Sequence, residues 1–195
     1  YSSALGTDGV TYTSPQEAPT ALHTAPVAVA ITVVRNHNFN TTPPGWNVSN
    51  TSLTTGAWVR GAPVDSRGPD SDFDGSGQCW VTGNSNNEDV DGGPTVLVTE
   101  TVDLSARQDP RVSFAIWFDS FNGNPDVMTI SASNDGGATW TGVENTGPTN
   151  GWQTRTIDVL ALFGTPGQFA MRFAVADQPN DSVTEAALDA FRIDD

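Results

Sequence analysis

Apolar and polar residues alternate along most of this 195-residue chain after residue 26. In segments such as 111–120 and 168–177, every second residue is large and apolar. Side chains that alternate in this way lie on opposite faces of a β-strand, so that one face is buried. Turn residues separate these segments. We therefore predict strands at 27–35, 56–61, 77–83, 95–104, 111–120, 126–134, 137–145, 152–159, 168–177 and 185–195.

The helical signal in the chain is weak by comparison. No long segment has the 3.6-residue period of an amphipathic helix, although LALFG at 160–164 fits a single helical turn. Many short strands separated by turns are typical of two packed sheets. The sequence therefore predicts an all-β fold, a two-sheet antiparallel β-sandwich of the jelly-roll type with an extended N-terminal arm.

The N-terminal part of the chain allows two interpretations. Residues 1–26 are a low-complexity arm of Thr, Ser, Ala and Pro, with too little apolar surface to become ordered alone. The next segment, 27–35, is apolar on both faces, one of which carries Val27, Val29, Ile31 and Val33. It either completes the sheet of a neighbouring copy, which builds head-to-tail filaments, or is the first strand of its own sandwich, residues 27–195.

Charge and cysteine content narrow the class of protein. The net charge is −15, from 23 acidic residues and 8 basic residues, all of them Arg, which argues against nucleic-acid partners and anionic membranes. No segment approaches the roughly 18 consecutive apolar residues that a membrane-spanning helix needs. The chain starts at Tyr1, which suggests a secreted, extracellular or cell-surface protein whose signal peptide has been removed. Cys79 is the single cysteine, and we expect it to be buried.

Acidic residues gather at three places that are candidates for calcium binding, because calcium prefers carboxylate and carbonyl oxygens. The DSDFDGSG segment begins like a calcium-binding loop, but Val81 stands where an EF-hand has Glu. The alternative is that these acidic residues are solvated residues of turns. The candidate metal ligands are Asp70, Asp72 and Asp74 in the first place, Glu88, Asp89 and Asp91 in the second, and Glu185 and Asp189 in the third.

Six motifs in order resemble a jelly-roll module related to MAM domains, found in secreted bacterial peptidases and surface proteins. They are FNTTPPGWNV, TGAWVRGAPV, CWVTGN, DVDGGPTVLVTETVDLS, SNDGGATW and EAALDAFRI. The resemblance implies a non-catalytic extracellular domain, often with structural calcium, in which an Asp of the last strand meets the loop near the first acidic place. Family members commonly follow the Phe of the first motif with Glu, whereas here Phe39 is followed by Asn40.

One of these motifs, SNDGGATW, also resembles the Asp-box, a structural hairpin motif. That resemblance implies that Ser133 and Asp135 stabilise the turn and that Trp140 packs beneath it. By their neighbours in the sequence, Trp80 and Trp140 are expected in the core.

The sequence favours binding over catalysis. It has two histidines and lacks the HExxH, GxSxG, Walker and CxxC motifs, so we expect no enzyme. Sugars stack on exposed aromatic rings, and Trp152 and Trp117 are the best candidates for such ligand-binding platforms, although each also fits a core position. Two hypotheses follow: a calcium-stabilised structural or adhesive protein that binds copies of itself, and a monomeric module that binds glycans.

Overall fold

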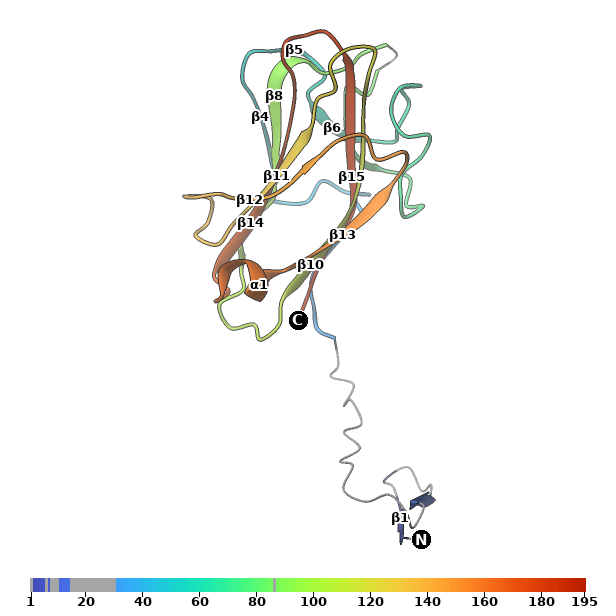
Figure 1. The fold of residues 1–195 in the computed structure, drawn as a ribbon, viewed down its shortest axis with the longest axis vertical. Helices are drawn as coiled ribbons and strands as arrows, with labels where there is room; N and C mark the ends of the chain where they lie inside the picture. The colour runs from blue at the N-terminus through green and yellow to red at the C-terminus, as the bar shows by residue number, and fades with distance from the viewer. Residues whose placement is uncertain (1, 6, 8–10, 15–30, 86) are drawn as a thin grey trace. The chain divides into compact units, whose positions relative to one another are not determined.

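The computed structural model describes residues 2–5, 7, 11–14, 31–85 and 87–195 (Figure 1). It divides into two compact units, Tyr1–Ala30 and Ile31–Asp195. In the first unit, β1 (Ser2–Leu5) pairs antiparallel with β2 (Thr11–Ser14), although this composition did not predict strands. Among the described residues, no helix has the length and apolar character needed to cross a membrane.

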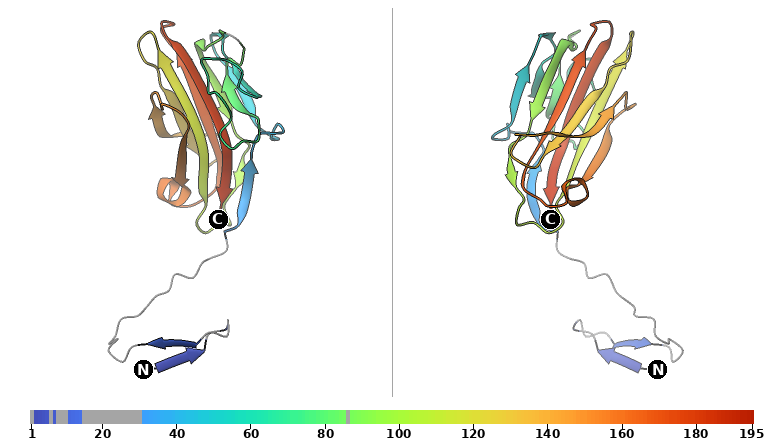
Figure 2. Two further views of the ribbon diagram at one scale, coloured as in Figure 1. Left: turned by 90° about the vertical axis from the view of Figure 1, so that its right-hand side faces the viewer. Right: turned by 60° about the vertical axis from the view of Figure 1, so that its left-hand side comes forward.

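The second unit is a sandwich of two antiparallel sheets, which confirms the predicted fold class. The first sheet has the order β13-β10-β15-β7-β6, with β3 also paired to β15, and Figure 2 shows β10 and β15 side by side. Its strands are β3 (Val33–His37), β6 (Trp58–Gly61), β7 (Cys79–Thr82), β10 (Arg111–Phe121), β13 (Gln153–Asp158) and β15 (Val183–Asp194).

The second sheet has the order β12-β11-β14-β8-β4 and faces the first across the core (Figure 1). Two short strands are attached to it, because β5 pairs with β8 and β9 pairs with β14. Its strands are β4 (Asn47–Asn50), β5 (Leu53–Thr55), β8 (Asp91–Val98), β9 (Val102–Asp103), β11 (Met128–Ser133), β12 (Thr141–Thr146) and β14 (Gln168–Asp177).

The core between the sheets follows the alternation of the sequence. The predicted inward faces of β10 and β14 are fully buried, and they carry Val112, Phe114, Ile116, Phe118, Phe169, Met171, Phe173 and Val175. Truncating one buried aromatic residue of this kind to Ala costs about 3–5 kcal/mol. The predicted helical turn is also present as α1 (Val159–Phe163), where the Asp158 carboxylate accepts a capping hydrogen bond from Ala161 N.

The strand predicted at 27–35 is wrong in its bounds. The described strand is β3, from Val33 to His37, and it pairs antiparallel with β15 of its own chain, with His37 opposite Phe191. Val27 and Val29 lie outside the described residues. Ile31 precedes the strand, and 73% of it is exposed, while half of Val33 is exposed.

The strand predicted at 95–104 begins four residues earlier than expected, so Asp91 of the acidic stretch lies in a strand while Glu88 and Asp89 precede it. Strand β8 begins at Asp91 and includes Gly92, whose φ is +81°. A side chain on Gly92 would place its Cβ 2.5 Å from the Ser52 carbonyl oxygen, so glycine is what allows β5 to lie this close. The rest of the predicted strand 95–104 divides between β8 and β9.

Candidate functional site

The loop that joins β6 to β7, residues 62–78, lies over the outer face of β15. Glu185, Ala187 and Asp189 alternate along this strand and share that outer face, yet all three are buried. A second apolar cluster forms here from Cys79, Val81 and Ala187, with Trp117 and Trp152 packed against it. The β6–β7 loop therefore covers two buried carboxylates, one on either side of Ala187.

The first carboxylate, Asp189, meets two acidic residues of the loop. Ligand oxygens of Asp72, Asp74 and Asp189 all lie within 4.8 Å of one another. The Asp189 Oδ2 atom accepts hydrogen bonds from the backbone N–H of Phe73, at 2.8 Å, and of Asp74, at 3.2 Å. The prediction that an Asp of the last strand meets the DSDFDGSG loop is realised in these contacts.

The loop around this cluster is held by its own acidic side chains. Asp72 Oδ2 accepts a hydrogen bond from Gly77 N at 2.9 Å, and Asp74 Oδ1 accepts one from Ser76 N at 2.8 Å. These bonds fix the direction of both carboxylates, so that their free lone pairs converge with those of Asp189.

The donor set fits a hard cation such as calcium. Burial raises the pKa of Asp189 to about 6, so its carboxylate is largely ionised at neutral pH and repels its two neighbours. The nearby Cys79 thiol has a pKa well above its ordinary value, because of burial first and then the charges of Asp189, Asp72 and Asp74. It therefore stays protonated and does not offer the thiolate that zinc prefers. Asp72, Asp74 and Asp189 would hold the cation, with further oxygens needed to complete its shell.

The second buried carboxylate, Glu185, faces a different arrangement. Its Oε2 atom accepts a hydrogen bond from Thr82 Oγ1 at 2.8 Å, while Oε1 has no partner among the described residues. Burial raises the pKa of Glu185 to about 9, so this side chain is neutral at pH 7.

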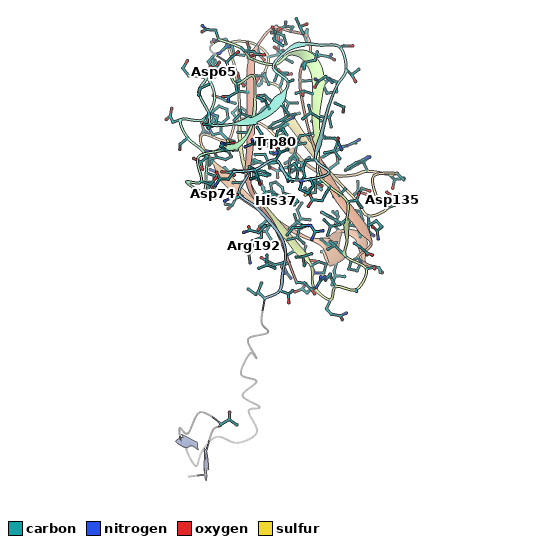
Figure 3. All side chains as sticks on the ribbon, turned by 180° about the vertical axis from the view of Figure 1, so that it is seen from behind. His37, Asp65, Asp74, Trp80, Asp135 and Arg192 are labelled. Carbon is teal, nitrogen blue, oxygen red and sulfur yellow. The ribbon has the colours of Figure 1, made fainter. Side chains whose placement is uncertain are left out.

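Arg67 brings positive charge to this end of the loop. Its Nη1 atom lies 3.1 Å from Asp89 Oδ1, and its Nε atom lies 3.6 Å from Asp65 Oδ1. The pKa of Asp89 is nevertheless raised, chiefly by burial. Figure 3 shows Asp65 near one end of the sandwich and Asp74 farther along the same side. Sequence reasoning missed Arg67, because nothing in its local pattern shows that the loop returns it to the acidic stretch.

The other predicted metal ligands lie apart from the three-carboxylate cluster. Glu88 Oε1 accepts a hydrogen bond from Gly56 N at 3.1 Å, and Asp91 Oδ2 accepts one from Thr55 Oγ1 at 2.8 Å. Asp70 is exposed in the middle of the β6–β7 loop. Within the described residues, the structure thus gathers three of the eight predicted ligands at one point.

The aromatic candidates lie beside the Asp189 cluster. Trp152 donates from Nε1 to the Ser71 carbonyl at 2.9 Å, and its ring centroid lies 5.9 Å from that of Phe73. Phe73 is 42% exposed, and Trp152 and Trp117 are less exposed, since both are half-buried. Phe73 of the loop and Trp152, which precedes β13, therefore form an aromatic pair beside the Asp189 cluster, and sequence reasoning missed Phe73.

Trp140 is not a core residue, which corrects the prediction. It is half-buried beside Gly137 of the Asp-box turn, with the Arg172 guanidinium 4.7 Å from its ring centroid. The turn itself forms as expected: Ser133 Oγ donates to Asp135 Oδ1 at 2.7 Å, and Thr139 N donates to the same oxygen at 2.9 Å. Hydrogen bonds, first from the Thr139 side chain, lower the pKa of Asp135 to about 2. Trp80, in contrast, is buried as predicted.

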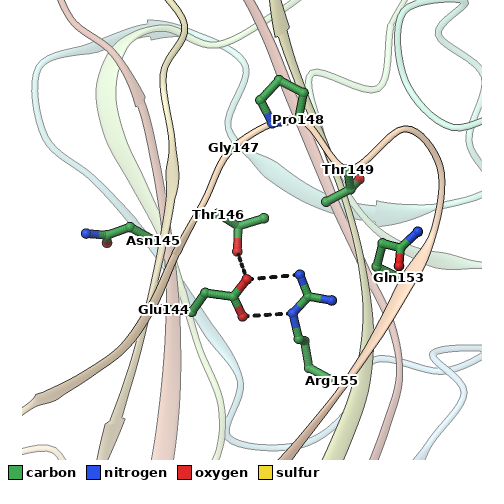
Figure 4. A pocket seen from close by; sticks show the side chains of 8 residues that line it. All are labelled: Glu144, Asn145, Thr146, Gly147, Pro148, Thr149, Gln153 and Arg155. Atoms are coloured by element: carbon green, nitrogen blue, oxygen red, sulfur yellow. Dashed lines mark hydrogen bonds and ion pairs between the residues drawn. The ribbon is translucent and has the colours of Figure 1, made fainter.

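An open cavity of about 520 Å³ lies between the edge strands β12 and β13 (Figure 4). Glu144 and Arg155 form a two-point ion pair there, with N–O distances of 2.8 and 2.9 Å. Glu144 lies opposite Ile130, and Arg155 lies opposite Phe114, so both belong to the inner faces of the two sheets. Because Glu144 and Arg155 bind each other, we interpret the ion pair as a structural link between β12 and β13 at this edge of the sandwich.

Solved structures with a similar fold include adhesin domains. The K1 cleaved adhesin domain of Lys-gingipain from Porphyromonas gingivalis W83 has a TM-score of 0.56 and 16% identity, covering 85% of this chain and 98% of that one. The K3 domain of the same protein has a TM-score of 0.55 and 16% identity, covering 83% and 98%. A variant of the family 29 carbohydrate binding module CBM29-2, solved with mannohexaose, has a TM-score of 0.48 and 15% identity, covering 86% and 93%.

At these identities the likeness to the adhesin domains shows a shared fold and confirms the jelly-roll part of the expected resemblance. No family model matches the chain, and no curated protein matches it. The functional assignment therefore depends on the chemistry of the loop and of the sheet surfaces.

Proposed function

We propose that this chain is a non-catalytic, extracellular, calcium-stabilised module that binds carbohydrate through the aromatic pair Phe73 and Trp152. The observation that carries the proposal is the contact between Phe73 N and Asp189 Oδ2, at 2.8 Å. It joins the exposed ring of the pair to the carboxylate cluster suited to calcium.

Calcium has a clear physical role in this arrangement. Three carboxylates within 4.8 Å repel one another, and a divalent cation at that point would neutralise them and tie the loop to β15. The loop would then hold Phe73 against Trp152 in a fixed orientation. A rigid aromatic surface loses little entropy when a sugar ring stacks on it. Extracellular calcium modules commonly bind the ion at about 10⁻⁴–10⁻³ M, which matches calcium outside cells.

The environment of the described histidine supports a non-catalytic function. His37 Nε2 lies 2.9 Å from Glu100 Oε1, and the ring stacks against Phe39 and Phe191. Glu100 also accepts hydrogen bonds from Arg35 and Trp46. His37 is therefore held by a packed network that gives it no nucleophile to activate.

Affinity electrophoresis in gels that contain neutral polysaccharides such as mannan, xylan or mixed-linkage β-glucan tests the carbohydrate proposal. We expect retardation by at least one polymer in calcium, and its loss in Phe73→Ala and Trp152→Ala. Phe121→Ala is the matched control, because Phe121 is similarly exposed, at 37%, on another part of the sandwich. Equal retardation of Phe73→Ala, Trp152→Ala and Phe121→Ala would contradict the proposed contact surface.

Self-association is the second candidate, because Ile31, which precedes the edge strand β3, and Val33, which begins it, expose 73% and 50% of their surface. The pairing of β3 with β15 means that donation to another copy would use the residues before Val33 or require β3 to be released. Light scattering tests this: filaments or oligomers that become monomers on deletion of residues 1–32 would support it. A monomeric full-length chain in calcium would contradict it.

A further inference from the structure

The outer face of the second sheet is built almost entirely from short side chains. Its strand register places two neighbouring rows across β12, β11, β14, β8 and β4. The rows are Asn145, Thr129, Ala174, Val96 and Ser49, and Gly142, Ser131, Arg172, Val98 and Asn47. At the usual strand spacing of about 4.8 Å, five strands span about 19 Å. We call these two rows the floor of the outer face. Arg172, on the central strand β14, is the one long charged side chain in them.

The two outer faces of the sandwich differ in what covers them. On the first sheet, Trp117 and Trp152 pack against the buried residues Cys79, Val81 and Ala187, and the β6–β7 loop binds Asp189 beside them. On the second sheet, no comparable apolar cluster forms outside the core among the described residues. Ser131 in the middle of the floor is buried, whereas Asn47, Ser49 and Asn145 are exposed and Arg172 is partly exposed. These exposed groups are accessible to a ligand that lies across the strands.

Arg172 is distinctive among the arginines of this acidic chain. Six others form ion pairs with carboxylates, namely Arg35, Arg67, Arg107, Arg111, Arg155 and Arg192. Arg60 hydrogen-bonds to Gln78 and to the Phe39 carbonyl. Arg172 lies over the Trp140 ring and forms neither an ion pair nor a side-chain hydrogen bond with the residues that the structure describes. Its guanidinium donors are thus available.

Trp140 and the Asp-box turn hold Arg172 in place. The Trp140 ring lies beside Gly137 of the turn, where an added Cβ would be 3.4 Å from it, and the turn is fixed by the bonds of Asp135. An arginine stacked on an aromatic ring keeps its planar N–H edge free, and that edge matches the two oxygens of a carboxylate. Stacking also restrains the side chain before a ligand arrives, which lowers the entropy lost on binding.

We propose that the outer face of the second sheet binds a carboxylate-bearing polysaccharide, with Arg172 paired to a sugar carboxylate. Asn47, Ser49, Thr129 and Asn145 lie in the same two rows and offer hydroxyl and amide groups to the sugar hydroxyls. A nucleic acid is a poor fit, because it needs several phosphate-binding cations and this floor has one. The site differs in face and ligand chemistry from the Phe73–Trp152 surface, and it does not depend on that proposal.

Titration calorimetry with an oligogalacturonate too short to gel with calcium tests this site. The same oligosaccharide as its methyl ester is the matched ligand, because it keeps the sugar backbone and removes the charge. A sialylated oligosaccharide distinguishes terminal carboxylates from those within a chain. We expect binding of at least one acid form and at least tenfold weaker binding of the methyl ester.

The variants identify the residue responsible. We expect Arg172→Gln to weaken binding of the acid ligand by about tenfold to a hundredfold, because a charge-assisted bidentate contact is lost. Arg172→Lys should recover only part of that loss, because lysine lacks the planar fork. Arg111→Gln is the control, since Arg111 is an exposed arginine of the other sheet, paired with Asp109 and Asp158.

Two results would overturn the site. One is unchanged affinity in an Arg172→Gln variant whose melting temperature equals that of the native chain. The other is no measurable binding of any acid ligand at millimolar concentration. The Phe73→Ala variant should bind the acid ligand normally, so that failure of this proposal and failure of the proposed function are distinguishable.

Discussion

The backbone N–H of Phe73 donates a 2.8 Å hydrogen bond to Oδ2 of Asp189, although 116 positions separate the two residues in the chain. This bond fixes the β6–β7 loop to the last strand at the point where three carboxylates converge. The exposed ring of Phe73 on the loop and the buried carboxylate of Asp189 on β15 are therefore one structural unit. Changes at either residue should affect the other.

The first prediction concerns calcium and stability. A ligand present at a hundred times its Kd stabilises the folded state by about 2.7 kcal/mol. For a domain of this size, about 1 kcal/mol shifts Tm by roughly 2–4 °C. Chelation of a sample that holds calcium at a hundred times the Kd, about 10–100 mM for the affinities given above, should therefore lower Tm by about 5–10 °C. Asp189→Asn should abolish this calcium dependence, while Asp109→Asn, on the exposed surface, should retain it. Calorimetry in calcium and in chelator measures both, and a native Tm that chelator leaves unchanged would exclude the cation.

The second prediction concerns pH in the absence of calcium. Burial raises the pKa of Glu185 from 4.5 to about 9, so between these values the folded protein binds a proton that the unfolded chain has released. Stability from this group is therefore present at low pH and falls as pH rises through that range. Asp189 acts in the same direction between 3.8 and about 6.

Urea denaturation in chelator between pH 5 and pH 8 measures this slope. Glu185→Gln mimics the neutral form, so the variant should match the native stability at pH 5 and lose less stability at pH 8. A native chain and a Glu185→Gln variant with the same pH slope would show that Glu185 is ionised in the folded state.

The third prediction concerns Arg67, whose guanidinium group forms an ion pair with Asp89 of the acidic stretch 88–91. Removing one partner of a buried ion pair costs about 3–5 kcal/mol, and because the Arg67 side chain is 21% exposed we expect about 2–3 kcal/mol for Arg67→Gln. Arg111→Gln, whose side chain is 50% exposed, should cost under about 1 kcal/mol. Equal effects of the two substitutions on the urea midpoint would mean that Arg67 contributes no more than a surface pair.

The fourth prediction concerns Gly92. A Cβ at this position would lie 2.5 Å from the Ser52 carbonyl oxygen, in a backbone conformation with φ of +81°. Gly92→Ala should therefore destabilise the fold by about 2–4 kcal/mol, through backbone strain and displacement of β5. Gly147→Ala is the control, because nothing lies within 4 Å of its added Cβ. Thermal melts of the two variants compare them directly, and similar Tm values would remove the close approach as a constraint.

The sequence predicted the long strands well, because their signal is local. In β10 and β14 the two-residue period alone identifies which side chains are buried, as at Phe114 and Phe173. Strands β4 and β5 carry the sequences NVSN and LTT, which have no such period. They form because β8 offers them a partner across the sheet, and local patterns do not report a partner distant in the chain.

The candidate site was predictable in part for the same reason. The spacing of Asp72 and Asp74 predicted a candidate cation-binding loop, and the family resemblance supplied the Asp of the last strand. The contact of Arg67 with Asp89 depends on how the β6–β7 loop returns to the sheet, which no short motif encodes. Trp140 was misplaced because the Asp-box fixes the turn beside it without fixing which face of the sheet the ring covers.

The β6–β7 loop is fastened at two points that respond to different chemistry. At Asp189 the loop donates two backbone hydrogen bonds to β15 beside the proposed cation site, whereas Arg67 ties the preceding part of the loop to Asp89. Low calcium would loosen the half of the loop that carries Phe73 and leave the Arg67 half in place. The sandwich would then report external calcium at one surface, while the Arg172 face, carried by the opposite sheet, would be insensitive to it.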